Sequence, residues 1–411
     1  MASQHDMTVT AKLRLRPFPA MRFNAGLVGD VGEVTSPPYD VMDRPMIDAL
    51  LGDHPQNIVR LVLPRMVSDP VRSADPYARA ARLLARWRDQ GIVVTDAEPA
   101  LYVYEYGDAS TQVCGVVGAL ELRKPDTHVV LPHEGVIPDI VADRLAMMAA
   151  SQANLEPILL VYDGAGSTRE ILDRTRTADP LTDVCARDGT RHRLWALDDA
   201  AEIRVIRRAL APHQALIADG HHRYASYLQL RRRHHSIGDG EGPWDRGLAM
   251  LIDQSQYPLR LAAIHRSVSE LRLDAVRSTA GFDAGPLEWC SDGPPPPPRE
   301  RGQFVVSDSR QYTVISLTRS RDRVVSDAEL LHTRLLPAWG VSEDQVGYHH
   351  TVTQTLRNAQ QDAGLAVLLH PSTVDEVLEV ARAGKVMPRK STSFGPKPRT
   401  GLVMRSFDDE P

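Results

Sequence analysis

At its centre the chain reads Ala215-Leu216-Ile217-Ala218-Asp219-Gly220-His221-His222-Arg223-Tyr224. The apolar run predicts a buried strand, Asp219-Gly220 predicts a tight turn, and the amphipathic segment 224–233 predicts a helix. A helix start carries N–H groups without helical partners and a partial positive charge. Two histidines and an arginine oppose that charge unless an anion binds there, and Gly220 lets the backbone approach closely. We therefore expect Gly220, His221, His222 and Arg223 to bind phosphate; the alternative is a helix start whose cations are only solvated.

The rest of the chain predicts an α+β fold, with mixed sheets and flanking helices around this strand-turn-helix unit. Hydrophobic residues make up 42% of the 411 residues and charged residues 25%, which is typical of a globular protein with two or three domains. Periodicity predicts strands at 58–63, 100–106, 113–122 and 155–162 and within 31–41, and helices at 75–90, 137–153 and 200–210.

Five prolines within Ser291–Gly302 give the clearest candidate boundary, because such a run favours an extended spacer over packed core. A long surface loop is the alternative, since strand-like sequence lies on both sides. We expect a disordered lead at 1–12, a main domain at 13–288, a linker or loop at 289–302, a C-terminal α/β region at 303–406 and a frayed tail at 407–411.

The net charge of −5 argues against general binding of nucleic acid. Cys114, Cys185 and Cys290 are far apart and form no disulfide framework or CxxC pair, which fits a reducing cytoplasm. The N-terminal sequence shows no signal peptide, and no window is apolar enough for a transmembrane helix. We expect a cytoplasmic protein with a small-molecule substrate and neither a membrane nor a nucleic-acid partner, while the oligomeric state is open.

Two further polar clusters contain carboxylates. His133-Glu134 follows a predicted strand and precedes a predicted helix, so the pair could hold a metal or act as a general base. Asp40 follows Pro37-Pro38-Tyr39, a loop that the prolines restrict, and could also be catalytic. Helix capping is the alternative for both carboxylates.

A basic run near the C-terminus, residues 384–401, combines lysines and arginines with hydroxyls and glycines. Lys390, Ser391, Thr392 and Lys397 could surround phosphate oxygens with charge and hydroxyl donors. The run is not a Walker A loop, because GxxxxGK[ST] is absent. A solvated basic loop is the alternative interpretation.

Several separated stretches together resemble the bacterial family called domain of unknown function 1015 (DUF1015). The matching stretches are Ser36–Val41, Leu131–Glu134, Pro157–Tyr162, Ala218–Tyr224, Met387–Thr392, Pro396-Lys397 and Thr400–Leu402. They occur in order over nearly the whole chain, which makes the resemblance specific. The family itself names no reaction.

The segment Asp219–Arg223 also resembles the phosphate-binding motif of the ParB/sulfiredoxin superfamily, which includes free-serine kinases with the same Asp-Gly-His-His-Arg string. This resemblance implies that Gly220, His221, His222 and Arg223 contact nucleotide phosphates and that Asp219 lies beside the reacting groups. It implies ATP or ADP as the nucleotide. The catalytic glutamate of those kinases has no aligned counterpart here, so Asp40 or Glu134 would have to replace it.

These observations lead to a nucleotide-dependent phosphotransferase that acts on a hydroxylated metabolite, with free serine or a related amino acid as the acceptor. Asp219, Glu134, Asp40 and His133 are the catalytic candidates, and Asp219 with Glu134 would hold Mg²⁺. The alternatives are a ParB-like nucleotide-binding switch or scaffold without transfer chemistry, and a metal-dependent phosphohydrolase.

Overall fold

The computed structural model describes residues 12–67, 75–164, 166–291, 293–318 and 326–409, so most of the predicted disordered lead lies outside it. The chain divides into two compact units. Unit 1 comprises Met1–Leu131, Val136–Leu259 and Pro396–Pro411, and unit 2 comprises Pro132–Gly135 and Arg260–Gly395.

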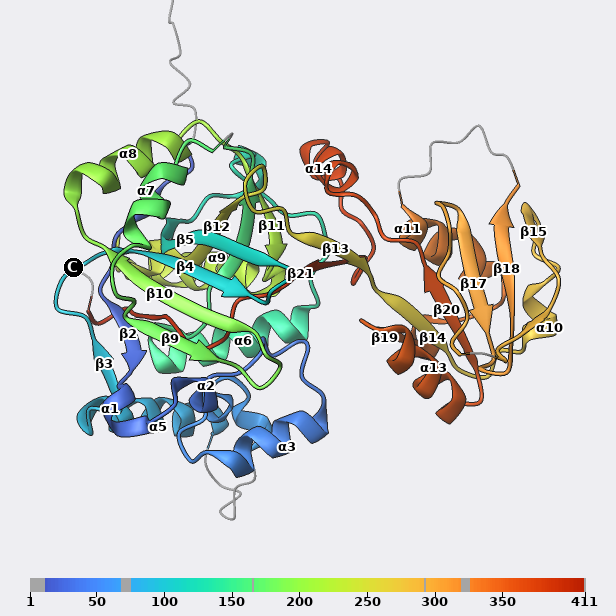
Figure 1. Cartoon of the computed structure of the whole chain (residues 1–411), viewed down its shortest axis with the longest axis horizontal. Coiled ribbons are helices and arrows are strands. Elements are labelled where there is room, and N and C mark those ends of the chain that lie inside the picture. Colours follow the sequence, from blue (N-terminus) through green and yellow to red (C-terminus); the bar gives the residue numbers. More distant parts are fainter. Residues whose placement is uncertain (1–11, 68–74, 165, 292, 319–325, 410–411) are drawn as a thin grey trace, which may run out of the picture. The chain divides into compact units, whose positions relative to one another are not determined.

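Figure 1 labels the helices and strands. The strands of unit 1 are β1 (Leu15–Arg16), β2 (Ala20–Phe23), β3 (Val93–Thr95), β4 (Leu101–Gly107), β5 (Gln112–Glu121), β6 (Val130–Leu131), β7 (Ala153–Asn154), β8 (Ile158–Tyr162), β9 (Thr182–Cys185), β10 (Arg191–Leu197), β11 (Ala215–Asp219), β12 (Arg246–Asp253) and β22 (Met404–Ser406). Its helices are α1 (Ala25–Val28), α2 (Val31–Val34), α3 (Arg44–Asp53), α4 (Val59–Val62), α5 (Pro76–Asp89), α6 (Pro138–Ser151), α7 (Arg169–Thr175), α8 (Ala200–Leu210) and α9 (His221–Ile237).

In unit 2 the strands are β13 (Arg260–Ala263), β14 (His265–Val268), β15 (Phe282–Ala284), β16 (Glu288–Trp289), β17 (Gln303–Ser307), β18 (Gln311–Leu317), β19 (Val346–His349), β20 (Leu365–Leu369) and β21 (Thr392–Gly395). Its helices are α10 (Leu273–Val276), α11 (Asp327–Leu330), α12 (Leu336–Ala338), α13 (Val352–Gln361) and α14 (Val374–Arg382).

Unit 1 is built on a large mixed sheet with the strand order β6-β11-β8-β12-β5-β4-β10-β9 and with β1 paired to β5. β12 runs parallel to β8, whereas β11 runs antiparallel to β8. Every residue of β8 and β11 is buried, which explains why their sequences are continuous apolar runs rather than alternating patterns. The prediction of mixed sheets with flanking helices is confirmed.

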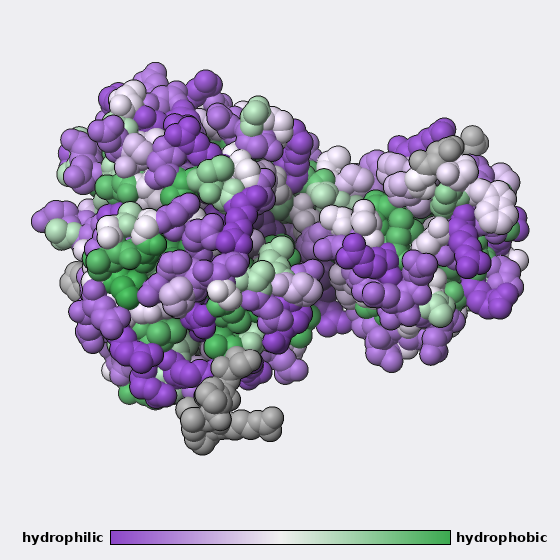
Figure 2. All heavy atoms as spheres, turned by 60° about the horizontal axis from the view of Figure 1, so that its bottom comes forward, coloured by the Kyte–Doolittle hydropathy of each residue, from purple (hydrophilic) through white to green (hydrophobic). Residues whose placement is uncertain are grey.

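Helices pack on this sheet through apolar side chains. Tyr224, Tyr227 and Leu230 of α9 join the core of unit 1, as do residues of α7 and α8. α6 contacts both α9 and α5 (Figure 1). On the face drawn in Figure 2, polar side chains predominate and apolar residues form separate patches. The buried residues of the described chain are chiefly hydrophobic.

Unit 2 contains a second sheet with the order β15-β18-β17-β20-β14-β19, and β16 also pairs with β18. The proline-rich segment 291–302 thus connects strands of one sheet, since β15 and β16 precede it and β17 follows it. A spacer between two domains and a surface loop stay the two interpretations of this segment. The predicted division between 13–288 and 303–406 therefore differs from the observed units, because β13 to β16 belong to the second sheet or its unit.

The chain returns to unit 1 at Pro396, where β22 pairs with β2 and with β7. This return also holds part of the segment that we expected to fray. Asp409 forms an ion pair with Arg88 at 2.7 Å and accepts a hydrogen bond from Thr95. Residues 410–411 lie outside the described part of the chain.

Two predicted strands are helices in the structure. Within 31–41, Val31–Val34 forms α2. Asp30 caps the start of this helix, because its side chain accepts a hydrogen bond from the N–H of Gly32. Within 58–63, Val59–Val62 forms α4, and Asn57 accepts from the N–H of Val59. Short apolar runs that are buried on all sides do not distinguish a strand from a helical turn, so local side-chain bonding decided these cases.

Gly220 connects β11 to α9 with φ +96°, and a Cβ at this position would lie 2.8 Å from Cγ2 of Ile158. We predict that Gly220→Ala lowers the free energy of unfolding by about 2 kcal/mol or more, through backbone strain and the clash together. Gly238→Ala is the matched control, because Gly238 ends the same helix at φ +88° with nothing within 4 Å of its Cβ position. Urea unfolding should show a clearly smaller loss for the control; equal losses would contradict this account.

Candidate functional site

The predicted strand, turn and helix start all form, as β11, Gly220 and α9. The register between β11 and β8 shifts between Ile217 and Asp219, which is the two-against-one pairing of a β-bulge. Asp219, the last residue of β11, is 8% exposed. The bulge therefore lies directly before Asp219, whose carboxylate precedes the start of α9.

Asp219 is held by two cations. Its Oδ2 accepts a hydrogen bond from Nη2 of Arg223, one helical turn further on. Its Oδ1 lies 2.5 Å from Nζ of Lys397. Both oxygens of the buried carboxylate are thus engaged by positive charge.

Lys397 joins Asp219 to Asp40. The lysine Nζ lies 3.1 Å from Oδ2 of Asp40, although the two residues are 357 positions apart in the sequence. Burial lowers the pKa of the Lys397 amine, but Asp219 and Asp40 raise it by more, so that the pKa lies above its ordinary value. The amine consequently stays protonated between the two carboxylates.

Arg223 points into the protein rather than out of the helix start. Its side chain is 4% exposed, its Nη1 donates to the carbonyl of Pro157, and its Nε lies 3.6 Å from Oε1 of Glu156. Burial lowers the pKa of the guanidinium, while Glu156 and Asp219 raise it above its ordinary value. Protein carboxylates therefore compensate the cation that the sequence left without an anion, and the contact of Arg223 with phosphate stays a prediction.

The start of α9 has no side-chain cap, because Gly220 occupies the cap position. The N–H of Ile137 donates to Nε2 of His222 at 3.0 Å. A ring nitrogen that accepts a hydrogen bond carries no proton, so this contact requires a neutral His222. His221 and His222 are partly exposed at the helix start, where phosphate binding by these two residues stays a prediction.

A hydrogen-bond chain, buried at Tyr104 and His192 and exposed at Asp188, anchors the segment that carries Lys397. The N–H of Arg399 donates to the hydroxyl of Tyr104, which lies 2.9 Å from Nδ1 of His192. On the other side of the ring, Nε2 lies 2.9 Å from Oγ1 of Thr190, which donates to Asp188. Since a carboxylate only accepts, Thr190 takes the proton of Nε2–H and Nδ1 accepts from Tyr104. Burial lowers the pKa of His192, so the ring is neutral and its Nδ1 accepts this hydrogen bond.

Sequence reasoning missed Tyr104, His192, Glu156 and Arg399. Tyr104 and its neighbour Tyr106 face the same side of β4, where the hydroxyl of Tyr106 donates to the carbonyl of Pro396. The alternation of tyrosines along residues 102–106 was the available signal, because period-two spacing places them on one face.

Glu134 and His133 belong to unit 2, together with the loop that contains Ser391 and Thr392. Oε1 of Glu134 accepts from the N–H groups of Ser391 and Thr392 at 3.0 and 2.8 Å and from Oγ1 of Thr392 at 2.8 Å. Nε2 of His133 lies 2.7 Å from the same hydroxyl, so the proton order runs from His133 through Thr392 to Glu134. The predicted Glu134 and hydroxyl loop therefore do meet, and they form a cluster within unit 2.

Lys390 sits beside this cluster in a left-handed conformation, with φ +55°. Its carbonyl accepts a hydrogen bond from the fully buried Arg266 at 2.9 Å. The contact fixes the backbone immediately before Ser391 and Thr392.

The magnesium site predicted at Asp219 and Glu134 stays a prediction. Asp219 lies in unit 1 and Glu134 in unit 2, and each carboxylate already has several partners from the protein. Within residues 12–409, apart from the gaps named above, no group of three or more His, Cys, Asp or Glu side chains is arranged to hold a metal ion. The carboxylate of Asp219 already pairs with Arg223 and Lys397, which makes it a poor ligand for a further cation.

Comparison with known proteins identifies the family. A family model described as "Protein of unknown function (DUF1015)" matches residues 15–336. The chain therefore belongs to this family, as its separated motifs predicted. No curated protein matches the chain. The part of the chain that the structure describes contains no helix long and apolar enough to cross a membrane.

Solved structures show only low similarity to the chain. A free serine kinase in complex with ADP has a TM-score of 0.37 and 13% sequence identity, over 68% of this chain and 87% of its own. SbnI from Staphylococcus aureus, truncated at its C-terminus, has a TM-score of 0.37 and 10% identity, over 69% and 84%. A conserved hypothetical protein from Pyrococcus furiosus has a TM-score of 0.37 and 13% identity, over 72% and 96%. Such values assign no function to this chain.

The neutral His192 predicts how stability depends on pH. Burial, with a contribution from Arg399, lowers the pKa of His192 from 6.5 to about 3 in the folded chain. The unfolded chain therefore binds more protons between these values, and the free energy of unfolding falls as the pH drops below 6.5. The loss amounts to about 1–2 kcal/mol by about pH 5.

We predict that His192→Asn, which keeps an acceptor near Nδ1, removes the loss of unfolding free energy that His192 causes between about pH 6.5 and about pH 5. Unfolding of the variant and of the parent chain is measured at both of these pH values. The exposed His128, replaced in the same way, serves as the control and should leave the pH dependence as in the parent chain. An unchanged pH dependence in His192→Asn would show that His192 is not the group responsible.

Proposed function

We propose that the chain is a nucleotide-dependent phosphotransferase that acts on a hydroxyl group of a small metabolite, with free serine or a related amino acid as the first acceptor to test. The observation that carries the proposal is the Asp219–Lys397–Asp40 cluster at the start of α9. Phosphoryl transfer needs a phosphate that is held in place, neutralised charge and an oriented nucleophile. The cluster offers groups for each of these tasks.

Phosphate would be held at the helix start. The first turn of the 17-residue α9 favours negative charge, and Gly220 lets an anion approach the backbone. His221 and His222 lie in that turn, and Lys397 adds a cation through Asp219. We propose that these residues hold the phosphates of ATP or ADP, in line with the resemblance of Asp219–Arg223 to the kinase motif.

Asp40 is the proposed general base. Its carboxylate is 21% exposed and touches Lys397 through Oδ2. Lys397 would exchange this contact for a phosphate oxygen, which leaves Oδ2 of Asp40 able to accept the proton of the acceptor hydroxyl. Because Lys397 would release Asp40 only when phosphate binds, this arrangement would limit transfer of the phosphoryl group to water.

Charge neutralisation falls to Lys397 in this proposal, and no step passes through Mg²⁺. Arg223 acts on the reaction indirectly, because it holds Asp219 from the buried side. Glu134 and His133 have no assigned step in this proposal, since both side chains bond to the hydroxyl of Thr392. The expectations of a small-molecule substrate and of no nucleic-acid partner stay part of the proposal.

The first test is turnover. Incubation with ATP or ADP and a panel of hydroxylated amino acids and sugars should consume nucleotide only when an acceptor is present. We predict that Lys397→Met lowers kcat at least about 100-fold, because a charge-assisted contact to phosphate and the release of Asp40 are both lost. Lys385→Met, an exposed lysine of the same basic run, should keep full activity. Lys397→Arg, which keeps the charge, separates a catalytic defect from a folding defect.

Other outcomes of this assay identify the alternatives. Tight nucleotide binding without turnover across the panel would favour a nucleotide-binding switch. Release of inorganic phosphate without an acceptor would favour a phosphohydrolase. Full turnover in Lys397→Met would contradict the proposed site.

Arg223 gives a second kinetic test, which separates positioning from direct contact. We predict that Arg223→Lys lowers kcat at least about tenfold and changes the nucleotide KM less than about twofold, because the side chain orients Asp219 without touching phosphate. Arg232→Lys, an exposed arginine of the same helix, is the control. A KM effect as large as the kcat effect would return Arg223 to the phosphate-binding set.

A further inference from the structure

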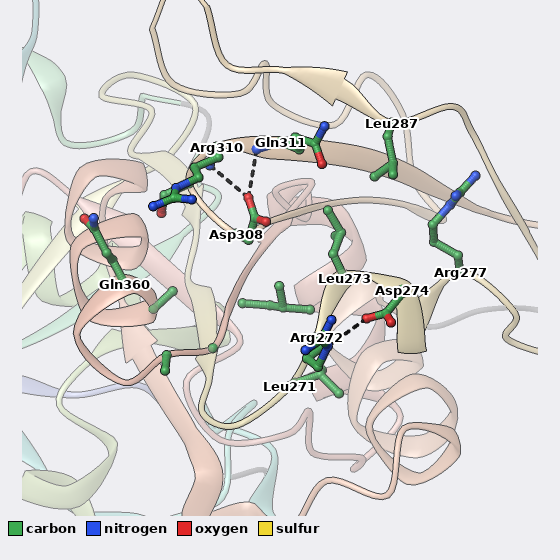
Figure 3. Close-up of a pocket in the computed structure, with 15 residues that line it drawn as sticks. Leu271, Arg272, Leu273, Asp274, Arg277, Leu287, Asp308, Arg310, Gln311 and Gln360 are labelled. Atoms are coloured by element: carbon green, nitrogen blue, oxygen red, sulfur yellow. Dashed lines mark hydrogen bonds and ion pairs between the residues drawn. The ribbon is translucent and has the colours of Figure 1, made fainter.

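Unit 2 contains a pocket of about 640 Å³ that is far from any residue of the proposed site in sequence and belongs to unit 2 alone. Figure 3 shows its lining side chains. They come from the segment around α10, from the turn between β17 and β18, and from the end of α13 with the start of β20. A volume of this size falls within the range of small-molecule sites in proteins.

Buried leucines form the floor of the pocket. Leu271 and Leu273 are each 8% exposed, and Leu365 is almost completely buried. Leu287 also lines the pocket and is 39% exposed. The exposed Trp289 pairs with Gln311 across β16 and β18, so both residues project from one face of the sheet.

The charges around the pocket are not balanced. The carboxylate of Asp308 accepts the N–H groups of Arg310 and Gln311 at 2.9 and 2.8 Å, and Asp274 pairs with Arg272 at 3.2 Å. Arg277 and Arg310 stand on opposite sides of the pocket in Figure 3. Neither forms an ion pair with a carboxylate within the described residues.

The two turns that frame the pocket hold fixed and unusual conformations. Ser309 has φ +75° and its N–H donates to Oγ of Ser307, while Ala363 has φ +49°. Hydroxyl Oγ of Ser309 also donates to the carbonyl of Leu356 in α13. Strained residues of this kind persist only where the surroundings fix them, so the frame is preformed.

We propose that this pocket binds a small molecule that carries one carboxylate on an apolar body, such as a medium-chain fatty acid or an aromatic acid. The floor and Leu287 would cover the apolar body, and Arg310 or Arg277 would bind the carboxylate. The two aspartates disfavour a larger polyanion, whose further charges would face them. This site goes beyond the proposed phosphotransferase and does not depend on it.

Isothermal titration calorimetry of the full chain tests the proposal with octanoate as the probe. Inorganic phosphate lacks the apolar body and 1-hexanol lacks the charge. We expect saturable binding of one octanoate, at least about tenfold tighter than the binding of either control compound.

Matched variants locate the binding. Arg310→Gln should weaken octanoate about three- to tenfold, as expected for an exposed ion pair, and Leu287→Ser should weaken it about threefold. Arg382→Gln, an exposed arginine of unit 2 outside the pocket, and Leu181→Ser, an exposed leucine of unit 1, should bind like the parent chain. Absence of saturable octanoate binding, phosphate binding as tight as octanoate, or equal effects of Arg310→Gln and Arg382→Gln would each overturn the proposal.

Discussion

The candidate site of unit 1 depends on the ion pairs that Asp219 forms with Arg223 and Lys397. Burying a charge costs several kcal/mol unless close partners compensate it, and removing one partner of a buried pair typically costs about 3–5 kcal/mol. Here Arg223 and Lys397 compensate Asp219, while Glu156 and Asp40 compensate the two cations in turn. The charges of the cluster therefore compensate one another only when all of the segments that carry them are folded together.

These segments come from distant parts of the chain. Asp40 precedes α3, Asp219 and Arg223 flank Gly220, and Lys397 arrives only after the chain has formed unit 2 and returned. Tyr104 and Tyr106 secure that return by bonding to Arg399 and Pro396. The site thus links the two ends of the chain through a sheet that the middle of the chain builds.

The sequence predicted what depends on local pattern. Strand β11, the turn at Gly220, helix α9 and the strands β4 and β5 follow from apolar periodicity and glycine chemistry. The inward direction of the Arg223 side chain did not follow from local pattern, since Glu156 and Pro157, whose oxygens it contacts, lie far upstream in the sequence. Glu134 and Lys397 were both shortlisted, but only the fold places Lys397 with Asp219 and Glu134 with Thr392. Helices α2 and α4 were missed because short buried runs carry no period.

The central claim is that phosphate binds at the start of α9 and draws Lys397 away from Asp40. A crystal structure of the chain with ADP tests it most directly. The account predicts a phosphate group at Gly220 and His221, within hydrogen-bond distance of Nζ of Lys397, with the contact between Lys397 and Asp40 broken. ADP bound at another place, or a Lys397 that keeps both carboxylates while the nucleotide is bound, would contradict it.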